Sequence, residues 1–93
     1  MIFDRKTYTI TKYDLSPDIL ALYEIHFAKD GKSARLERRN APGVWYIVER
    51  TGKSHFRVTR SGKDGTGKLN FGGINAVNHY LFDEAAEQMK LAL

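Results

Sequence analysis

The chain has 93 residues, contains no cysteine and carries a formal net charge of +4 at pH 7. This length is enough for one hydrophobic core, which predicts a single domain over residues 1–93. The composition excludes a disulfide framework, a thiolate nucleophile and a Cys-ligated zinc site, and the lack of an apolar run of roughly 18 residues or of a signal-peptide region predicts a cytoplasmic protein with no membrane partner.

The first predicted element is a strand over residues 7–13. Its Thr and Tyr content and its alternation of polar and apolar residues are typical of a half-exposed or edge strand. Asp14–Asp18 then interrupts the pattern, because Pro17 cannot donate to a sheet and pushes Ser16 out of the α region.

Residues 19–38 fit two alternatives. As a hairpin, Asp30-Gly31 forms a type I′ turn and the two arms alternate consistently across it. The inward residues would be Tyr23, Ile25, Phe27, Ala34 and Leu36, and the outward ones Glu24, His26, Arg35 and Glu37. As a helix, Ser16 would be the N-cap, Pro17 the first helical residue and Gly31 the stop. We favour the hairpin, because a helix here would be apolar almost all round.

The stretch from Pro42 to Arg60 reads as a second hairpin: an apolar run over residues 44–48, a turn around residues 51–53 and an alternating return over residues 55–60. With a two-residue turn, the inward side chains are Trp45, Ile47, Phe56 and Val58, and the outward ones are Tyr46, Arg50, His55, Arg57 and Thr59. A three-residue turn would invert one strand against the other. The favoured register predicts that Trp45 packs in the core against a C-terminal helix.

Residues 61–68 are too rich in glycine to hold regular structure, so we expect a flexible basic loop. Gly62, Gly67 and Lys68 have the spacing of a phosphate loop, but Leu69 occupies the position of the hydroxyl residue that would hold magnesium. The stretch is therefore interpreted as a loop whose lysines can meet a polyanion.

The C-terminal part is expected to be mainly helical. Residues 69–71 and 78–82 could form short strands, and residues 83–93 form a helix that Asp83 can cap. A longer helix that begins near Ile74 is the alternative, because its apolar residues also keep helical spacing. The predicted fold is α+β: a small antiparallel sheet of four or five strands with a C-terminal helix packed on one face.

Charge is concentrated in the middle of the chain. Residues 32–68 hold ten Lys and Arg against three Asp and Glu, whereas the two flanks are net negative. Such a segment attracts anionic partners, and an aromatic ring among the cations can stack on a base. The candidate binding residues are Tyr46, Arg50, Lys53, His55, Arg57, Arg60, Arg35, Arg38, Arg39, Lys63 and Lys68. The alternative is a solvated face whose Arg and Tyr side chains pair across strands.

Three histidines are too widely spaced to predict a metal site: His26, His55 and His79 lie 29 and 24 residues apart with no cysteine between them. We expect no metal and no cofactor. A catalytic alternative is a small ribonuclease, in which Arg57 and Lys53 contact phosphate, His55 is the acid or base and Tyr46 stacks on a base. In size and charge the chain resembles bacterial ribosome-dependent toxin ribonucleases.

Two further resemblances bear on function. The order from Gly43-Val44 through Phe56, Val58 and Leu69 to Phe82-Asp83-Glu84 resembles the three strands and helix of integrase-type and plant ethylene-response-factor DNA-binding domains, which implies a sheet that reads the major groove. The small, cysteine-free chain without a catalytic motif resembles phage-encoded anti-CRISPR proteins, which implies inhibition of a host defence complex in the host cytoplasm but assigns no residues.

The leading hypothesis is a non-catalytic binding protein whose basic sheet face occupies a nucleic-acid or nucleoprotein surface. Its most specific form is an anti-CRISPR-like inhibitor. A DNA-reading module is the second hypothesis and a small ribonuclease the third. We expect no small-molecule substrate.

Overall fold

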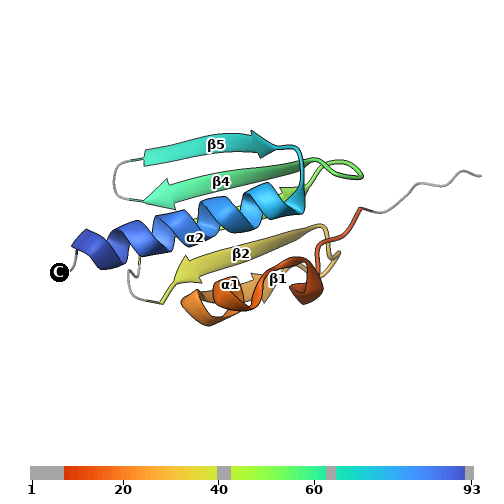
Figure 1. The fold of residues 1–93 in the computed structure, drawn as a ribbon. Coiled ribbons are helices and arrows are strands. Elements are labelled where there is room, and N and C mark those ends of the chain that lie inside the picture. Colours follow the sequence, from red (N-terminus) through yellow and green to blue (C-terminus); the bar gives the residue numbers. More distant parts are fainter. Residues whose placement is uncertain (1–7, 40–42, 63–64, 92–93) are drawn as a thin grey trace, which may run out of the picture.

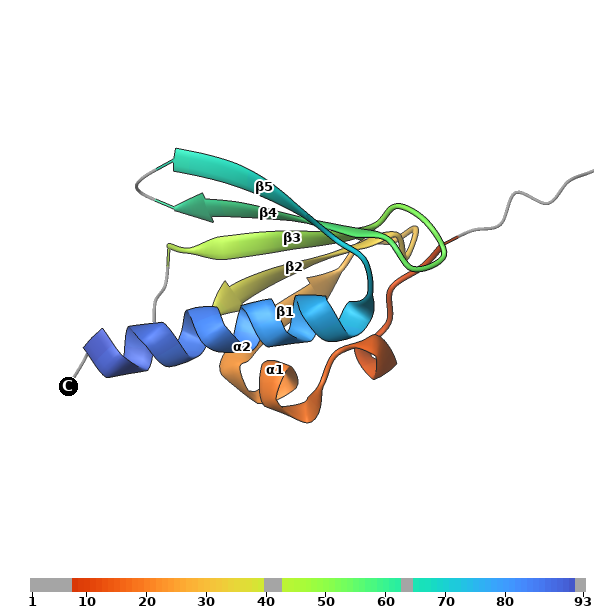
Figure 2. The same ribbon diagram turned by 45° about the horizontal axis from the view of Figure 1, so that its top comes forward.

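The computed structural model describes residues 8–39, 43–62 and 65–91, with side chains up to residue 86. The elements in chain order are a 3-10 turn η1 (Lys12–Asp14), α1 (Pro17–Leu22), β1 (Tyr23–Phe27), β2 (Ser33–Arg38), β3 (Trp45–Arg50), β4 (Phe56–Gly62), β5 (Gly65–Phe71) and α2 (Ile74–Leu91). The strands form one antiparallel sheet in the order β1-β2-β3-β4-β5. Both helices lie on the same face of this sheet (Figures 1 and 2). We call it the inner face and the opposite one the outer face.

The hydrophobic core lies between the inner face and the helices. Alternate strand residues point toward the helices, because successive side chains of a strand lie on opposite faces. The buried residues are Tyr23, Ala34, Leu36, Tyr46, Val48, Phe56 and Val58 from the sheet, Val77, Leu81 and Ala85 from α2, Ile19 from α1, and Ile10 and Leu15 from the N-terminal segment. The predicted α+β class, with a C-terminal helix on one face of the sheet, is confirmed.

The β1–β2 hairpin has the predicted register, in which Ile25 pairs with Leu36 and Phe27 with Ala34. Its turn is not type I′, since Gly31 (φ 72°) has a positive φ but no non-glycine residue of the described chain does. The segment between the strands instead covers residues 28–32, and the Ala28 amide donates to the Ser33 carbonyl (3.0 Å). The strand pairing keeps the same centre as the predicted turn, so each side chain stays on its predicted face. The helical alternative is also right in part, because α1 begins at Pro17 as its first residue.

The β3–β4 hairpin corrects the predicted register. Arg50 pairs with Phe56 and Val48 with Val58, which leaves a five-residue loop over residues 51–55. An odd loop length moves every residue of one strand to the other face. The prediction that Trp45 belongs to the core is therefore wrong: Tyr46 and Val48 point inward.

Arg50 holds this longer loop in place. Its guanidinium donates hydrogen bonds to the carbonyl oxygens of Gly52 (3.2 Å) and Lys53, and it also reaches the carbonyl of Thr9 (3.0 Å). The guanidinium carbon lies 5.4 Å from the centre of the Phe56 ring. A side chain predicted to face a ligand thus ties the loop and the N-terminal segment to the sheet.

The predicted strand over residues 7–13 is wrong for the part that the structure describes. Residues 8–11 have no regular structure, and Lys12–Asp14 forms the turn η1. Thr11 and Asp14 make a capping box, in which the Thr11 amide donates to the Asp14 carboxylate (2.8 Å). Ile10 is nevertheless buried, and its amide donates to the carbonyl of Gly31 (2.7 Å). Local capping has therefore outweighed strand propensity.

The glycine-rich stretch also differs from its prediction. β4 continues to Gly62 and β5 begins at Gly65, and these two residues pair across the strands. Lys63 and Asp64 lie outside the described residues. The glycine-rich residues of β5 have a low intrinsic preference for strands. They form one nevertheless, because the main-chain amides and carbonyls of β4 offer hydrogen-bond partners that do not depend on the side chains.

The longer of the two predicted C-terminal helices is the correct one. α2 begins at Ile74, so the predicted strand over residues 78–82 and the capping role of Asp83 are wrong, while residues 69–71 do belong to a strand. Val77, Leu81 and Ala85 follow the predicted apolar spacing and are buried.

Burial of tyrosine hydroxyls predicts a loss of stability at alkaline pH. Tyr23 is fully buried and donates to the Leu81 carbonyl (2.6 Å). Burial raises the pKa of Tyr23 well above its ordinary range and raises the pKa of Tyr80 to about 12. The folded state thus keeps protons that the unfolded chain loses near pH 10. The contribution of these groups to the free energy of unfolding should be constant and fully present below about pH 10. Above that pH it should be lost progressively.

Melting temperatures at pH 8, 10 and 11 test this expectation. Tyr23→Phe lacks the buried hydroxyl, so its melting temperature should fall less between pH 8 and 11 than that of the unmodified protein. Tyr13→Phe is the matched control, because Tyr13 is 86% exposed. Equal falls for both variants would contradict the assigned role of Tyr23.

Candidate binding face

The outer face carries three rows of side chains that cross the strands. No helix or strand of the described chain covers it (Figure 2). The strand pairings define the rows. The first row is Glu24, Glu37, Trp45, Ser61 and Thr66; the second is His26, Arg35, Ile47, Thr59 and Lys68; the third is Ser33, Glu49, Arg57 and Asn70. Apolar side chains occupy the middle of this surface and polar ones surround them.

Trp45 is the centre of the outer face. It lies on the middle strand of the sheet, is partly buried, and neighbours Ile47 along the strand. The guanidinium carbon of Arg35 lies 4.9 Å from the centre of the Trp45 ring, within the range of a cation–π contact. Such an aromatic platform can accept a flat or cationic group, and Arg35 is exposed, so it can move away from the ring.

The formal charge of the outer face is balanced but unevenly distributed. Arg35, Arg57 and Lys68 oppose Glu24, Glu37 and Glu49. Glu49 forms an ion pair with Arg57 (3.4 Å) on the half of the face that β3, β4 and β5 make. The rest of this half consists of Lys68, the apolar side chains of Trp45 and Ile47, and uncharged polar side chains.

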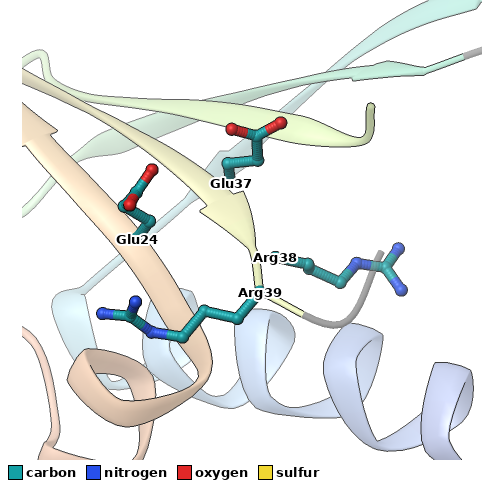
Figure 3. A pocket seen from close by; sticks show the side chains of 4 residues that line it. All are labelled: Glu24, Glu37, Arg38 and Arg39. Carbon is teal, nitrogen blue, oxygen red and sulfur yellow. The ribbon is translucent and has the colours of Figure 1, made fainter. Parts of the chain in front are cut away.

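The other half ends in two carboxylates. Glu24 and Glu37 are directly opposite each other in the β1–β2 pair. With Arg38 and Arg39 they line a shallow depression of about 240 Å³ (Figure 3). In that view the two glutamates rise on the same side, whereas Arg38 points away from them. The depression is thus lined by two carboxylates and two guanidinium groups.

Three of the predicted binding residues meet on the inner face instead, together with Glu84 of α2. Arg38 donates to the Tyr46 hydroxyl (2.9 Å), and that hydroxyl donates to Oε1 of Glu84 (2.8 Å). Arg60 donates to the same carboxylate oxygen (3.1 Å). Arg38 is 5% exposed and also donates to the Glu84 main-chain carbonyl (3.1 Å).

This cluster holds α2 on the sheet. Burial, followed by the hydrogen bond to Glu84, raises the pKa of Tyr46 above its ordinary value, so its phenol stays protonated. The cations face a carboxylate and a carbonyl of the chain itself. Tyr46, Arg38 and Arg60 thus stabilise the fold, and with Arg50 they are not available on the outer face.

The remaining predicted residues are divided among different places. Arg35, Arg57 and Lys68 lie on the outer face, and Lys53 and His55 are exposed in the β3–β4 loop. Arg39 follows β2 and donates to the Ala21 carbonyl (3.2 Å). Lys63 lies outside the described residues. The four residues of the ribonuclease hypothesis do not meet in one site, because Tyr46 is buried on the inner face.

Sequence reasoning missed Trp45 and Ile47, the central apolar members of the outer face, whereas it correctly predicted that Thr59 points outward. The missing information was the length of the β3–β4 loop, which decides which alternate residues point outward. The alternative of a three-residue turn also has an odd number of residues, so it would have placed Trp45 and Ile47 on the outer face.

The described residues include no group of three or more His, Cys, Asp or Glu side chains that could hold a metal ion. Within the same residues, neither helix has the length and apolar character needed to cross a membrane. Comparison with protein-family models, with curated proteins and with solved structures finds no match to this chain.

Proposed function

We propose that the protein binds nucleic acid, free or within a nucleoprotein surface, through its outer face. The observation that supports this proposal is the position of Trp45. The single tryptophan of the chain lies partly exposed in the middle of an uncovered sheet, with the Arg35 guanidinium against its ring. A base can take the place of the guanidinium on the ring, which frees the cation for a phosphate.

The distribution of polar groups supports the same partner. Thr59, Ser61, Thr66 and Asn70 supply hydroxyl and amide groups within reach of base edges, and Lys68 lies among them. A protein inhibitor of a host defence complex would use this face against the nucleic-acid part of that complex.

The outer face offers few cations to a phosphate backbone, and this limits how strongly the affinity should depend on salt. Among the residues that the structure describes, Arg35 and Lys68 have no ion-pair partner, whereas Arg57 is paired with Glu49. Each phosphate contact contributes about 0.7 to the salt slope for a single strand, so the slope should be shallow, at about one to two. Stacking on an aromatic ring contributes about 1–3 kcal/mol per base. Binding should therefore rely more on stacking than on charge.

The order of elements favours a second candidate, a DNA-reading module. β3, β4, β5 and α2 follow one another as three strands and a helix, and Gly72 and Gly73 alone link the last strand to the helix. The sheet face opposite the helix is uncovered, as it must be if a sheet is to enter a groove. Both candidates use the outer face, and they differ in the form of nucleic acid that they require.

A charge reversal tests whether the outer face contacts phosphates. The double variant Arg35→Glu, Lys68→Glu should bind a labelled oligonucleotide at least tenfold more weakly at low salt, with a much smaller difference at high salt. Lys12→Glu, Lys29→Glu is the matched control, since it changes net charge equally at exposed positions outside the sheet. Fluorescence anisotropy measures the affinity. Equal losses in both variants would show that net charge alone, and not this face, governs binding.

A further inference from the structure

We infer that the base stacked on Trp45 is guanine, and that Glu37 selects it by accepting hydrogen bonds from its Watson–Crick edge. This inference rests on the proposed function and names the base that the outer face prefers. It starts from the two side chains of β2 that flank the tryptophan. Glu37 lies directly opposite Trp45 in the β2–β3 pair, and Arg35 is the next residue of β2 on the same face.

These two side chains approach the indole from opposite directions along the strands. Arg35 is opposite Ile47, two residues after Trp45, and its guanidinium carbon lies 4.9 Å from the ring centre. The Glu37 carboxylate instead accepts a hydrogen bond from the amide of Gly43 (3.2 Å), two residues before Trp45. The Cβ atoms of directly opposite residues are about 5 Å apart, so a base stacked on the ring comes within reach of the carboxylate. The ring thus has a cation on one side and a carboxylate on the other.

The Glu37 carboxylate can accept further hydrogen bonds. An ionised carboxylate has about four lone-pair sites, and the Gly43 amide uses one of them. Among the residues that the structure describes, Glu37 has no ion-pair partner. Arg38 points to the inner face, and Arg39 donates to the main chain of α1 (Figure 3). Selection of a base depends on the direction of hydrogen bonding and needs no net charge in the depression.

Guanine is the base that matches a carboxylate best. Its Watson–Crick edge carries the N1–H and the N2 amino group side by side, so both can donate to one carboxylate. Adenine and cytosine place a ring nitrogen that accepts beside their amino group, and thymine places its N–H between two carbonyls. A carboxylate only accepts, so each of these bases would leave an acceptor facing an acceptor. A bidentate contact distinguishes bases by roughly 5- to 150-fold.

The position of Arg35 agrees with this orientation of the base. In a guanine nucleotide the sugar is attached at the opposite end of the purine from the N1–H and N2 amino group. When that edge faces Glu37, the sugar and phosphate extend toward Arg35. The guanidinium that the base displaces from the ring therefore lies on the side where the phosphate is.

The test measures binding of short single-stranded oligonucleotides that differ at one central base within a run of thymines. The central base is guanine, hypoxanthine or adenine, and hypoxanthine keeps the N1–H but lacks the N2 amino group. The unmodified protein should bind the guanine oligonucleotide about tenfold more tightly than the adenine one, with hypoxanthine between them. Quenching of Trp45 fluorescence measures the affinity, because Trp45 is the only tryptophan.

Glu37→Gln should reduce this preference to less than about twofold, because a neutral amide accepts through one oxygen only. Glu24→Gln is the matched control, since it removes the same charge one strand further from Trp45 and should keep the preference. Thermal melts of both variants should match the unmodified protein. Equal binding of all three oligonucleotides, a preference that Glu37→Gln retains, or one that Glu24→Gln loses equally would overturn the inference while leaving the proposed function in place. Absence of binding to any of them would overturn both.

Discussion

Trp45→Ala is expected to abolish most nucleic-acid binding while leaving the protein folded. The ring lies on the uncovered outer face, so its removal leaves no cavity in the core between the sheet and the helices. Loss of one stacked base corresponds to about 1–3 kcal/mol, or roughly 5- to 150-fold in affinity. Anisotropy titration with a single-stranded oligonucleotide and a thermal melt of the same sample measure the two effects.

Trp45→Phe is the control for this experiment, because it keeps an aromatic ring at the same position. It should retain most of the affinity. Unchanged binding by Trp45→Ala would contradict the stacking role. A cooperative transition lost in Trp45→Ala would instead show that the tryptophan supports the fold.

Tyr46→Ala is expected to have the opposite effect and to unfold the protein. Tyr46 is fully buried, and its ring packs edge-on against Tyr23 (5.7 Å between ring centres) and Tyr80 (6.2 Å). Removal of a buried aromatic side chain costs about 3–5 kcal/mol. A domain of this size has about 5–15 kcal/mol of stability in total, so the folded population should fall sharply. Urea unfolding followed by circular dichroism measures the change.

Tyr46→Phe separates the ring from its hydroxyl. The ring contacts remain, but Arg38 and Glu84 lose a partner in a buried cluster, so the expected cost is about 1–3 kcal/mol. A small loss of stability for Tyr46→Ala together with a large loss for Trp45→Ala would contradict the placement of Tyr46 on the inner face and Trp45 on the outer face.

The β1–β2 hairpin and α2 could be predicted from the sequence because their information is local. Alternation across the Asp30-Gly31 centre predicted which residues pair, and the pairing survived a longer loop since the centre did not move. The apolar spacing from Ile74 through Ala85 predicted a long helix, although a shorter one was preferred. Hydrophobic periodicity alone is enough to predict such elements, because it indicates which of their faces is buried.

The predicted basic face combined residues that the tertiary structure separates. Arg38 and Arg60 lie 22 residues apart in the chain, and both approach one carboxylate of Glu84. A buried arginine requires such a partner, because an uncompensated charge inside a protein is costly. Charge counts along a chain cannot show that the partner comes from a distant helix.

The sequence by itself determined the α+β class and the elements whose hydrophobic period is clear. Only the tertiary structure decided which face of the sheet is uncovered, and therefore that Trp45 and not Tyr46 is available to a partner. The physical reason is the two-residue period of a strand: one residue more or less in the loop over residues 51–55 exchanges the two faces. Both faces of β3 carry large apolar side chains, so composition does not distinguish them, and the burial of Tyr46 depends on Arg38 and Glu84 reaching it from β2 and α2.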